Sequence, residues 1–386
     1  MPAPSAAELR PEYLLDPGIA FLNHGSFGAC PRPVFERYQA WQRELEHEPV
    51  DFLARRLPEL LDGAREALAG YLGCHAEDLA FVPNATTGVN LAARSLDLRA
   101  GDEVLASGLE YGACDLAWEW VCRRVGARYV RAPIPLPLRD SNALVDALLA
   151  RASGRTRAIF VSHVASTTAL VLPVDEIVDR ARALGLVTVV DGAHAPAHVP
   201  LNLSKLDADF YSGNAHKWLS APKGAGFLHV RPEHQERVDA AIVSWGYTEG
   251  RTFLQRIESQ GTGDPAAWLT VPDAIAFQAE RDWDDVRDRC RRLAREARRE
   301  LCDLLQTEAL APDAMLAQMA AVRLPRPAPD LSERLFTRHR IEIPVEGDED
   351  DLLRLSVAAY TTREDIDRLL SALARELDAE HGQQDE

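Results

Sequence analysis

The sequence predicts an α/β protein with a mostly parallel central sheet flanked by helices, followed by a smaller α+β domain. Strand-like and helix-like segments alternate from about residue 80 to residue 230, which is typical of a sheet covered by helices on both faces. Two strand-like segments, residues 157–164 and 187–191, are almost continuous apolar runs, as expected for strands buried on both sides. Beyond residue 270 the pattern changes to a long amphipathic helix, short strand-like segments and a closing helix.

Each element follows from its local pattern. After an irregular N-terminal arm (residues 1–20), apolar residues at helical spacing predict helices at residues 33–49 and 57–73. In the alternating region we expect strands at 79–82, 102–108, 128–133, 157–164, 187–195, 208–214 and 225–230, and helices at 89–96, 114–126, 142–153 and 174–185, with a turn at 83–88. The C-terminal part predicts a helix at 283–306, strands at 319–325, 340–346 and 352–360, a helix at 362–380 and a frayed tail.

The length of 386 residues predicts two to three domains at about 150 residues each. We place an arm at residues 1–20, a large domain at residues 21–270 and a small domain at residues 271–386, with the N-terminal helices contributing to the small domain. The acidic run at residues 346–351 is expected to be a solvated loop.

Composition excludes several classes of function. The net charge of −17 argues against binding nucleic acid, which requires basic surface. No apolar run reaches the length of about 18 residues that a membrane span needs. Six scattered cysteines without a CxxC pair indicate reduced thiols in a cytoplasmic protein and no structural metal site.

Lysine is almost absent from this chain. Lys205, Lys217 and Lys223 are the only lysines among 43 basic residues. Arginine stays protonated, whereas lysine can lose its proton and act as a nucleophile. Residues 205–223 are therefore where we look for chemistry, although three leftover surface lysines would give the same count.

Three segments at predicted strand ends carry candidate residues. Asp191 ends a buried strand and needs a partner: a helix cap, an ion pair, a metal or a ring nitrogen. Lys217 lies between His216 and Trp218, where desolvation would make it a Schiff-base nucleophile, unless it is an ordinary loop lysine. Residues 84–88 precede a helix, so they form either an ordinary cap or a phosphate site.

Pyridoxal phosphate would use all three segments. It has a phosphate, a ring nitrogen that pairs with a carboxylate and an aldehyde that reacts with a lysine. Each segment is a modest signal alone, but their combination in one chain predicts this cofactor.

Five motifs resemble the class V aminotransferase family of fold-type I pyridoxal-phosphate enzymes, and within it the isopenicillin N epimerase-like branch. The resemblance spans roughly residues 20 to 375. The motifs are FLNHGSFGACPRPV, FVPNATTGVN, YSGNAHKWLSAPKGAGFL, GTGDPAAWLTVPDAIAF and LLRLSVAAYTTREDIDRLL.

The resemblance implies a role for each matching residue. Lys217 would form the Schiff base, Asp191 would pair with the ring nitrogen and Tyr111 would stack on the cofactor. Arg354 would bind the substrate carboxylate, and Thr262 would reach the phosphate of the partner subunit, which implies a homodimer. Further contacts with the cofactor would come from Ala85, Thr86, Ser166, His194, Asn214 and His216, and with the substrate from His24 and Asn23.

The resemblance implies an enzyme that acts at Cα of an amino acid or of an amino-acid-derived substrate. Epimerisation is the leading reaction, and it needs a second proton donor, for which Tyr111 and His24 are candidates. A β-eliminating C–S lyase for a cysteine conjugate or an aminotransferase are the alternatives. A non-catalytic member of the family is a further one, which Lys217, Asp191 and Arg354 disfavour. Sulfur transfer is disfavoured because no cysteine follows Cys302.

Overall fold

The computed structural model describes residues 3–328, 330–347 and 351–384. Its central sheet has seven strands in the spatial order β2–β8–β7–β6–β5–β3–β4. All pairs from β4 to β7 are parallel, and β8 is antiparallel to both of its neighbours. The predicted mostly parallel sheet is thus confirmed. The strands are β2 (Leu79–Val82), β3 (Glu103–Ser107), β4 (Arg128–Ala132), β5 (Thr156–Ser162), β6 (Val187–Gly192), β7 (Phe210–Asn214) and β8 (Gly226–Val230).

Helices surround this sheet and cover its apolar strands. They are α2 (His24–Phe27), α3 (Arg32–His47), α4 (Pro49–Asp51), α5 (Leu57–Leu72), α6 (Ala85–Ser95), α7 (Gly112–Val125), α8 (Ser141–Leu149), α9 (Val174–Ala183), α10 (Leu203–Leu206), α11 (Pro232–Gln235), α12 (Phe253–Glu258), α13 (Ala266–Leu269) and α14 (Val271–Ala279). Shorter helical turns are η1 (Arg10–Glu12), η2 (Phe52–Arg56), η3 (Ala76–Asp78), η4 (Trp245–Tyr247) and η5 (Asp313–Met315).

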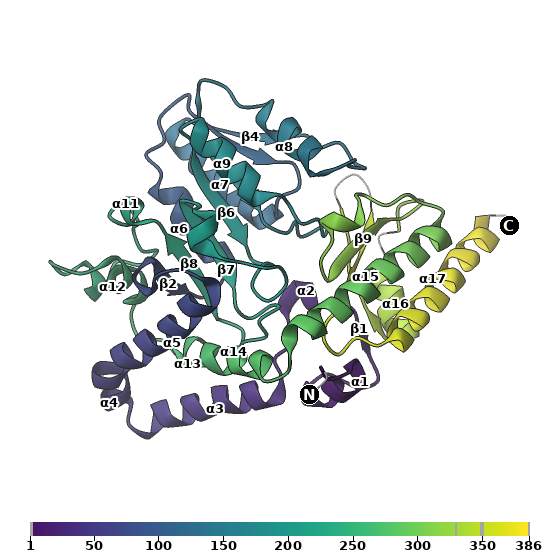
Figure 1. Ribbon diagram of the computed structural model, residues 1–386, viewed down its shortest axis with the longest axis horizontal. Coiled ribbons are helices and arrows are strands. Elements are labelled where there is room, and N and C mark those ends of the chain that lie inside the picture. Colours follow the sequence, from purple (N-terminus) through teal and green to yellow (C-terminus); the bar gives the residue numbers. More distant parts are fainter. Residues whose placement is uncertain (1–2, 329, 348–350, 385–386) are drawn as a thin grey trace.

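A second, smaller body lies beside the first in Figure 1. It contains a three-stranded antiparallel sheet in the order β11–β12–β9 and a parallel pair of β1 with β10. Its strands are β1 (Ala20–Phe21), β9 (Met319–Arg323), β10 (Ile341–Glu342), β11 (Val345–Glu346) and β12 (Leu352–Ser356), and its helices are α15 (Trp283–Leu305), α16 (Leu331–His339) and α17 (Arg363–Gln384).

The N-terminal arm packs on this smaller body. Leu9, Ala20 and Leu22 are fully buried in the same apolar cluster as residues of α15 and α17. The arm is not irregular as predicted, because residues 6–9 form α1 (Ala6–Leu9). A reciprocal capping box between Ser5 and Glu8 stabilises this turn. The boundaries of the arm and the two domains remain a proposal.

The predicted turn at residues 83–88 is wrong, because α6 already begins at Ala85. Asn84 caps the helix: its side chain accepts a 2.9 Å hydrogen bond from the Thr87 amide. Gly88 lets the first turn of α6 lie against β7, because a Cβ atom there would come within 2.0 Å of Ser212 Oγ. This contact holds the start of α6 at the edge of the sheet.

Several other boundaries differ from prediction, among them the ends of the strands predicted at 187–195 and 352–360, which are Gly192 and Ser356. The expected strand at 340–346 is split into β10, which pairs with β1, and β11, which pairs with β12. Pro344 lies between them and cannot donate a hydrogen bond to a ladder. The closing helix α17 continues to Gln384, through four residues of the predicted frayed tail. Among the described helices, none combines the length and apolar character of a membrane span.

Candidate active site

The candidate residues meet at the carboxyl-terminal edge of the parallel strands, as expected for an open α/β sheet. Asp191 lies near the end of β6 and is flanked by Ser162 of β5 and Ser212 of β7. Lys217 follows β7, and its Nζ lies 3.1 Å from Nε2 of His194, which follows β6. Sheet topology therefore joins residues that are 23 positions apart in the chain.

Asp191 is a buried carboxylate with an incompletely used oxygen. Its Oδ1 accepts a 2.9 Å hydrogen bond from the Ala193 amide, whereas its Oδ2 meets the Cys114 thiol at 3.5 Å. Burial raises the pKa of Asp191 above its ordinary value, and the Ala193 amide and the charge of Lys217 act in the opposite direction. A thiol is a weak donor, so Oδ2 is suited to a stronger one such as a pyridinium N–H.

Lys217 has the properties of an amine nucleophile. Desolvation lowers the pKa of its amine to about 8, although Asp191 partly opposes this effect. A substantial fraction of the Lys217 amine is therefore neutral near pH 8, and the neutral amine can react with a carbonyl. Lys223, in contrast, donates a 2.9 Å hydrogen bond to the Gly28 carbonyl, and Lys205 lies in α10, outside this cluster.

The start of α6 differs from the predicted anion site, because one of the two expected donor residues is already engaged. The Ala85 amide donates a 2.7 Å hydrogen bond to Asn214 Oδ1, so Asn214 holds the helix start against β7 and Ala85 has no free amide. In the described part of the chain, the Thr86 amide and hydroxyl donate no hydrogen bond. His216 lies nearby and uses Nδ1 on the Ala225 carbonyl at 3.2 Å. Thr86 and the helix N-terminus thus fit a phosphate.

Arg354 is buried in the middle of β12 with its guanidinium directed at the large body. Its Nη1 donates to the carbonyl and hydroxyl oxygens of Ser166 at 2.8 and 3.0 Å. Its Nη2 donates to Ser26 Oγ at 2.7 Å and approaches Asn23 Oδ1 at 3.5 Å. These contacts fix the guanidinium from both sides, and Ser166 therefore holds Arg354 in this structure.

Glu346 also binds Arg354, which corrects the prediction that it belongs to a solvated loop. Its Oε2 lies 3.2 Å from Arg354 Nη1, and its side chain is 38% exposed. Asp351, at the other end of the same run, accepts a hydrogen bond from the Ala328 amide. Residues 348–350 of the predicted loop lie outside the described residues. A carboxylate of the chain itself thus lies where the resemblance places a substrate carboxylate.

His24 connects the two bodies. Its Nδ1 lies 2.9 Å from the Tyr360 hydroxyl, and its Nε2 lies 3.0 Å from the Lys217 carbonyl oxygen. Burial lowers the pKa of His24 to about 3, so the ring is neutral. Gly25 allows this approach, because a Cβ atom there would come within 2.6 Å of Met319 Sδ. With both ring nitrogens engaged, His24 links the Tyr360 hydroxyl to the backbone of Lys217.

Tyr111 and Thr262 lie at the exposed side of the site. Tyr111 is 45% exposed at the start of α7, and its phenol is close enough to Arg354 for an electrostatic effect. Thr262 is exposed in the segment between α12 and α13. No hydrogen bond within the described chain joins Thr262 to the other candidates, and its predicted contact is with a partner subunit.

Sequence reasoning missed several residues that complete the site. Ser26 and Glu346 bind Arg354, Cys114 meets Asp191 and Trp218 bonds to His194. Ser26 and Trp218 could have been suspected, because each lies in a motif beside a candidate. Glu346 and Cys114 carried no local signal, because only the tertiary fold brings them to the site.

Glu110, next to Tyr111, is a further buried acid at this edge. Its carboxyl oxygens bond to the hydroxyls of Ser107 and Ser162, the latter at 2.6 Å. Burial raises the pKa of Glu110 to about 8, and the hydroxyls only partly oppose this. The group is therefore largely protonated at neutral pH.

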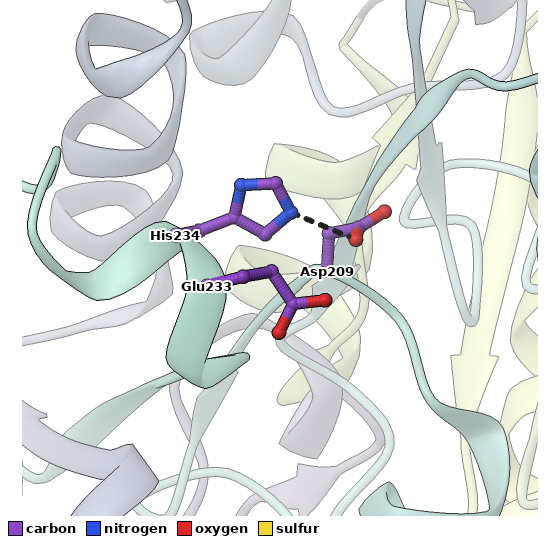
Figure 2. A group of neighbouring side chains, drawn as sticks. All are labelled: Asp209, Glu233 and His234. Atoms are coloured by element: carbon purple, nitrogen blue, oxygen red, sulfur yellow. Dashed lines mark hydrogen bonds and ion pairs between the residues drawn. The ribbon is translucent and has the colours of Figure 1, made fainter.

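One cluster outside the site has the residue types of a metal centre. Asp209, Glu233 and His234 lie close together in Figure 2, with His234 Nε2 2.9 Å from Asp209 Oδ1. Arg231, however, pairs with Asp209 at 3.5 Å and with Glu233 at 2.7 Å. The guanidinium already pairs with both carboxylates, so we assign the cluster to an ion-pair network.

Comparison with known proteins now places the chain. Residues 29–369 match the family described as Aminotransferase class-V. The chain belongs to the class V aminotransferase family. It is 43% identical to isopenicillin N epimerase of Streptomyces clavuligerus, an alignment that covers 95% of this chain and 97% of the relative. It is 32% identical to a putative L-cysteine desulfhydrase of Oryza sativa subsp. japonica, over 83% of this chain and 70% of that one.

A solved structure shows the same fold. The cysteine desulfurase CsdA of Escherichia coli superposes with a TM-score of 0.80 at 24% identity, covering 97% of this chain and 99% of that one. The predicted class V family and its fold-type I architecture are therefore confirmed, and the chain is an enzyme of that family. Family membership also confirms the predicted cofactor, pyridoxal phosphate. The unused Asp191 oxygen, the desolvated Lys217 and the free Thr86 donors fit that molecule.

The raised pKa of Glu110 makes stability depend on pH. The group is neutral in both states below its unfolded pKa of 4.5, and ionises first in the unfolded state as the pH rises to about 8. The free energy of unfolding therefore falls as the pH rises through that window. The total loss is about 1.4 kcal/mol for each unit by which the two pKa values differ. We expect Glu110→Gln to match wild type in melting temperature at pH 4.5 and to exceed it by several degrees at pH 8.

Scanning calorimetry of both proteins from pH 4.5 to pH 9 measures this difference. The control is Glu66→Gln, on the exposed side of α5. Its melting temperature should change with pH in the same way as that of wild type. If the difference in melting temperature between Glu110→Gln and wild type does not change with pH, Glu110 is ionised in the folded protein at neutral pH, which contradicts the prediction.

Proposed function

We propose that this enzyme is a pyridoxal-phosphate epimerase that inverts the configuration at Cα of an amino acid or of an amino-acid-derived substrate. The observation that carries the proposal is the 43% identity to isopenicillin N epimerase across nearly the whole chain. The arrangement of Lys217, Asp191 and Arg354 supports it, because these residues supply a base, a counter-charge and a carboxylate anchor.

The bound cofactor supplies an electron-withdrawing ring that acidifies the Cα–H bond. Asp191 favours this by holding positive charge at the ring nitrogen with its Oδ2. Arg354 binds the substrate carboxylate and orients Cα, because guanidinium and carboxylate pair in a fixed bidentate geometry. Lys217, with a pKa of about 8, is suited to remove and return the proton at Cα near neutral pH.

Inversion requires a proton at the face of Cα opposite Lys217. Of the two candidates, His24 has both ring nitrogens engaged by Tyr360 and Lys217. The Tyr111 hydroxyl forms no hydrogen bond with the described residues and lies on the exposed side of the site. We therefore assign the second proton to Tyr111.

A C–S lyase is the second candidate function. The 32% identity to a putative cysteine desulfhydrase favours it, and the same base and anchor would serve β-elimination. The two reactions, and transamination, differ in what happens after the Cα proton leaves. Product analysis therefore distinguishes them.

Incubation of the holoenzyme in heavy water with a panel of amino acids and cysteine conjugates tests the reaction. We expect deuterium at Cα together with inverted configuration, measured by proton NMR and chiral chromatography. Keto acid with a released thiol would instead establish a lyase, and keto acid with an aminated cofactor a transaminase.

Two variants identify the proton carriers in the same experiment. Lys217→Ala should lose both exchange and inversion, as well as the visible absorption band. Tyr111→Phe should retain exchange at Cα with the original configuration but lose inversion by at least about tenfold, a loss of about 1.4 kcal/mol of transition-state stabilisation. Inversion at the wild-type rate in Tyr111→Phe would contradict its assignment.

Glu346 should compete with substrate for Arg354. A substrate carboxylate has to displace or share the 3.2 Å contact of Glu346 with Nη1. We expect Glu346→Gln to lower KM for the amino acid several-fold at an unchanged kcat, because a neutral amide competes less well. Glu300→Gln, which removes an exposed pair with Arg363, is the control. A higher KM in Glu346→Gln would mean that Glu346 supports the anchor.

We further propose a cytoplasmic homodimer with shared active sites. All six cysteines are free thiols, which suits a reducing compartment. Several large apolar side chains are exposed near Thr262 in the sequence, among them Ile242, Val243 and Trp245, the last 81% exposed. Contiguous exposed apolar residues of this kind are typical of interfaces.

Sedimentation velocity tests the dimer. Wild type is expected to sediment as two chains, and Trp245→Glu should shift the equilibrium at least tenfold toward the monomer, because a carboxylate would be buried unpaired. Leu184→Glu, at an exposed leucine after α9, should remain dimeric. A wild-type monomer at all accessible concentrations would contradict the proposal.

A further inference from the structure

His194 is held at both ring nitrogens. Trp218 Nε1 donates a hydrogen bond to His194 Nδ1 at 3.4 Å, and His194 Nε2 lies 3.1 Å from Lys217 Nζ. An indole nitrogen can only donate. Nδ1 must therefore be unprotonated in this arrangement.

This constraint fixes the direction of the second hydrogen bond. The ring is buried, and this burial is the main cause that lowers the pKa of His194 well below its ordinary value. A neutral ring with an unprotonated Nδ1 carries its proton on Nε2. Nε2–H then donates to Lys217, whose nitrogen must offer a lone pair. The contact is thus compatible with a neutral lysine and not with an ammonium group.

Trp218 is itself held in position by residues outside the motif. Its ring stacks on His198, with centroids 4.0 Å apart and planes 10° from parallel. Gln278 donates a 2.9 Å hydrogen bond to the Trp218 carbonyl. The indole therefore cannot turn away from His194 without losing its stack on His198, and Gln278 fixes the backbone that carries it.

His198 has a fixed tautomer as well. The backbone amide of Gln318 donates to His198 Nε2 at 2.8 Å. The His198 proton is therefore on Nδ1, which donates to the His194 backbone carbonyl at 2.9 Å. Gln318 directly precedes β9 of the smaller body. Hydrogen bonds of defined direction thus link that body to the His198 ring and to the backbone of His194.

We propose that Trp218 is a positioning residue that fixes His194 in its Nε2–H tautomer, so that the ring donates to Lys217 and favours the neutral form of its amine. The inference rests on the proposed role of Lys217 and is independent of which reaction the loaded enzyme catalyses. Without the indole N–H, His194 can move its proton to Nδ1 and accept from an ammonium group on Lys217. The charged form of Lys217 is then favoured.

The scarcity of lysine makes this measurable directly. In full-length protein labelled with 13Cε-lysine and freed of cofactor with hydroxylamine, only Lys205, Lys217 and Lys223 give signals. Lys205→Arg identifies one signal, and reaction with added pyridoxal phosphate identifies that of Lys217. We expect the Lys217 titration midpoint near pH 8 in wild type and at least one pH unit higher in Trp218→Phe.

Trp118→Phe is the matched control. Trp118 is also a fully buried tryptophan of the large body, but its indole nitrogen has no hydrogen-bond partner in the described structure. It should leave the Lys217 midpoint unchanged even if it lowers the melting temperature. Equal midpoints in Trp218→Phe and Trp118→Phe would overturn the proposal.

A second measurement uses wild type alone and so does not depend on whether a variant folds. 15N NMR of histidine-labelled, cofactor-free protein reports which nitrogen of His194 carries the proton, with His194→Gln identifying the signal. Protonated Nε2 and unprotonated Nδ1 support the proposal, and a proton on Nδ1 overturns it. Failure of the epimerase proposal would appear only in product analysis and would leave both NMR results unchanged.

Discussion

The site depends on keeping one amine neutral inside a protein whose other cations are almost all arginines. Desolvation lowers the pKa of Lys217 to about 8, and His194 belongs to the shell of residues around its amine. Arginine in that shell would remain charged. Arg354 shows the opposite solution: it stays charged while buried because Ser166, Ser26 and Glu346 accept its hydrogen bonds. The two cations of the site therefore need opposite surroundings although both lie where the two bodies meet.

Much of the fold was predictable because the parallel strands are short, apolar and separated by amphipathic helices. The strand predicted at 79–82 and the helix predicted at 283–306 agree with β2 and α15 to within one residue. Prediction failed where side chains cap the backbone. The start of α6 depends on Asn84 and on the close approach of Gly88 to Ser212, and α1 on the Ser5–Glu8 capping box. The first of these depends on a contact between distant segments, whereas the second could have been identified from the sequence alone.

The site was predictable to the extent that its chemistry lies in short motifs. Asp191, His194 and Lys217 follow adjacent strands, so sheet topology alone brings them together. Arg354 was suggested by the family resemblance, but its partners Glu346 and Ser26 come from the two opposite ends of the chain. No periodicity connects them. Likewise, Cys114 reaches Asp191 only because α7 packs against the sheet, and a lone cysteine in a helix gives no sign of that contact.

The smaller body contributes to both halves of the chemistry. It supplies Arg354 from β12, and its Gln318 binds His198, which stacks on Trp218 beside His194. His24 adds a third connection, from Tyr360 to the Lys217 carbonyl. A displacement of this body would therefore move the carboxylate anchor and disturb the stack that holds Trp218 beside His194. The anchor for the substrate and the residues beside the base thus depend on the position of the same body.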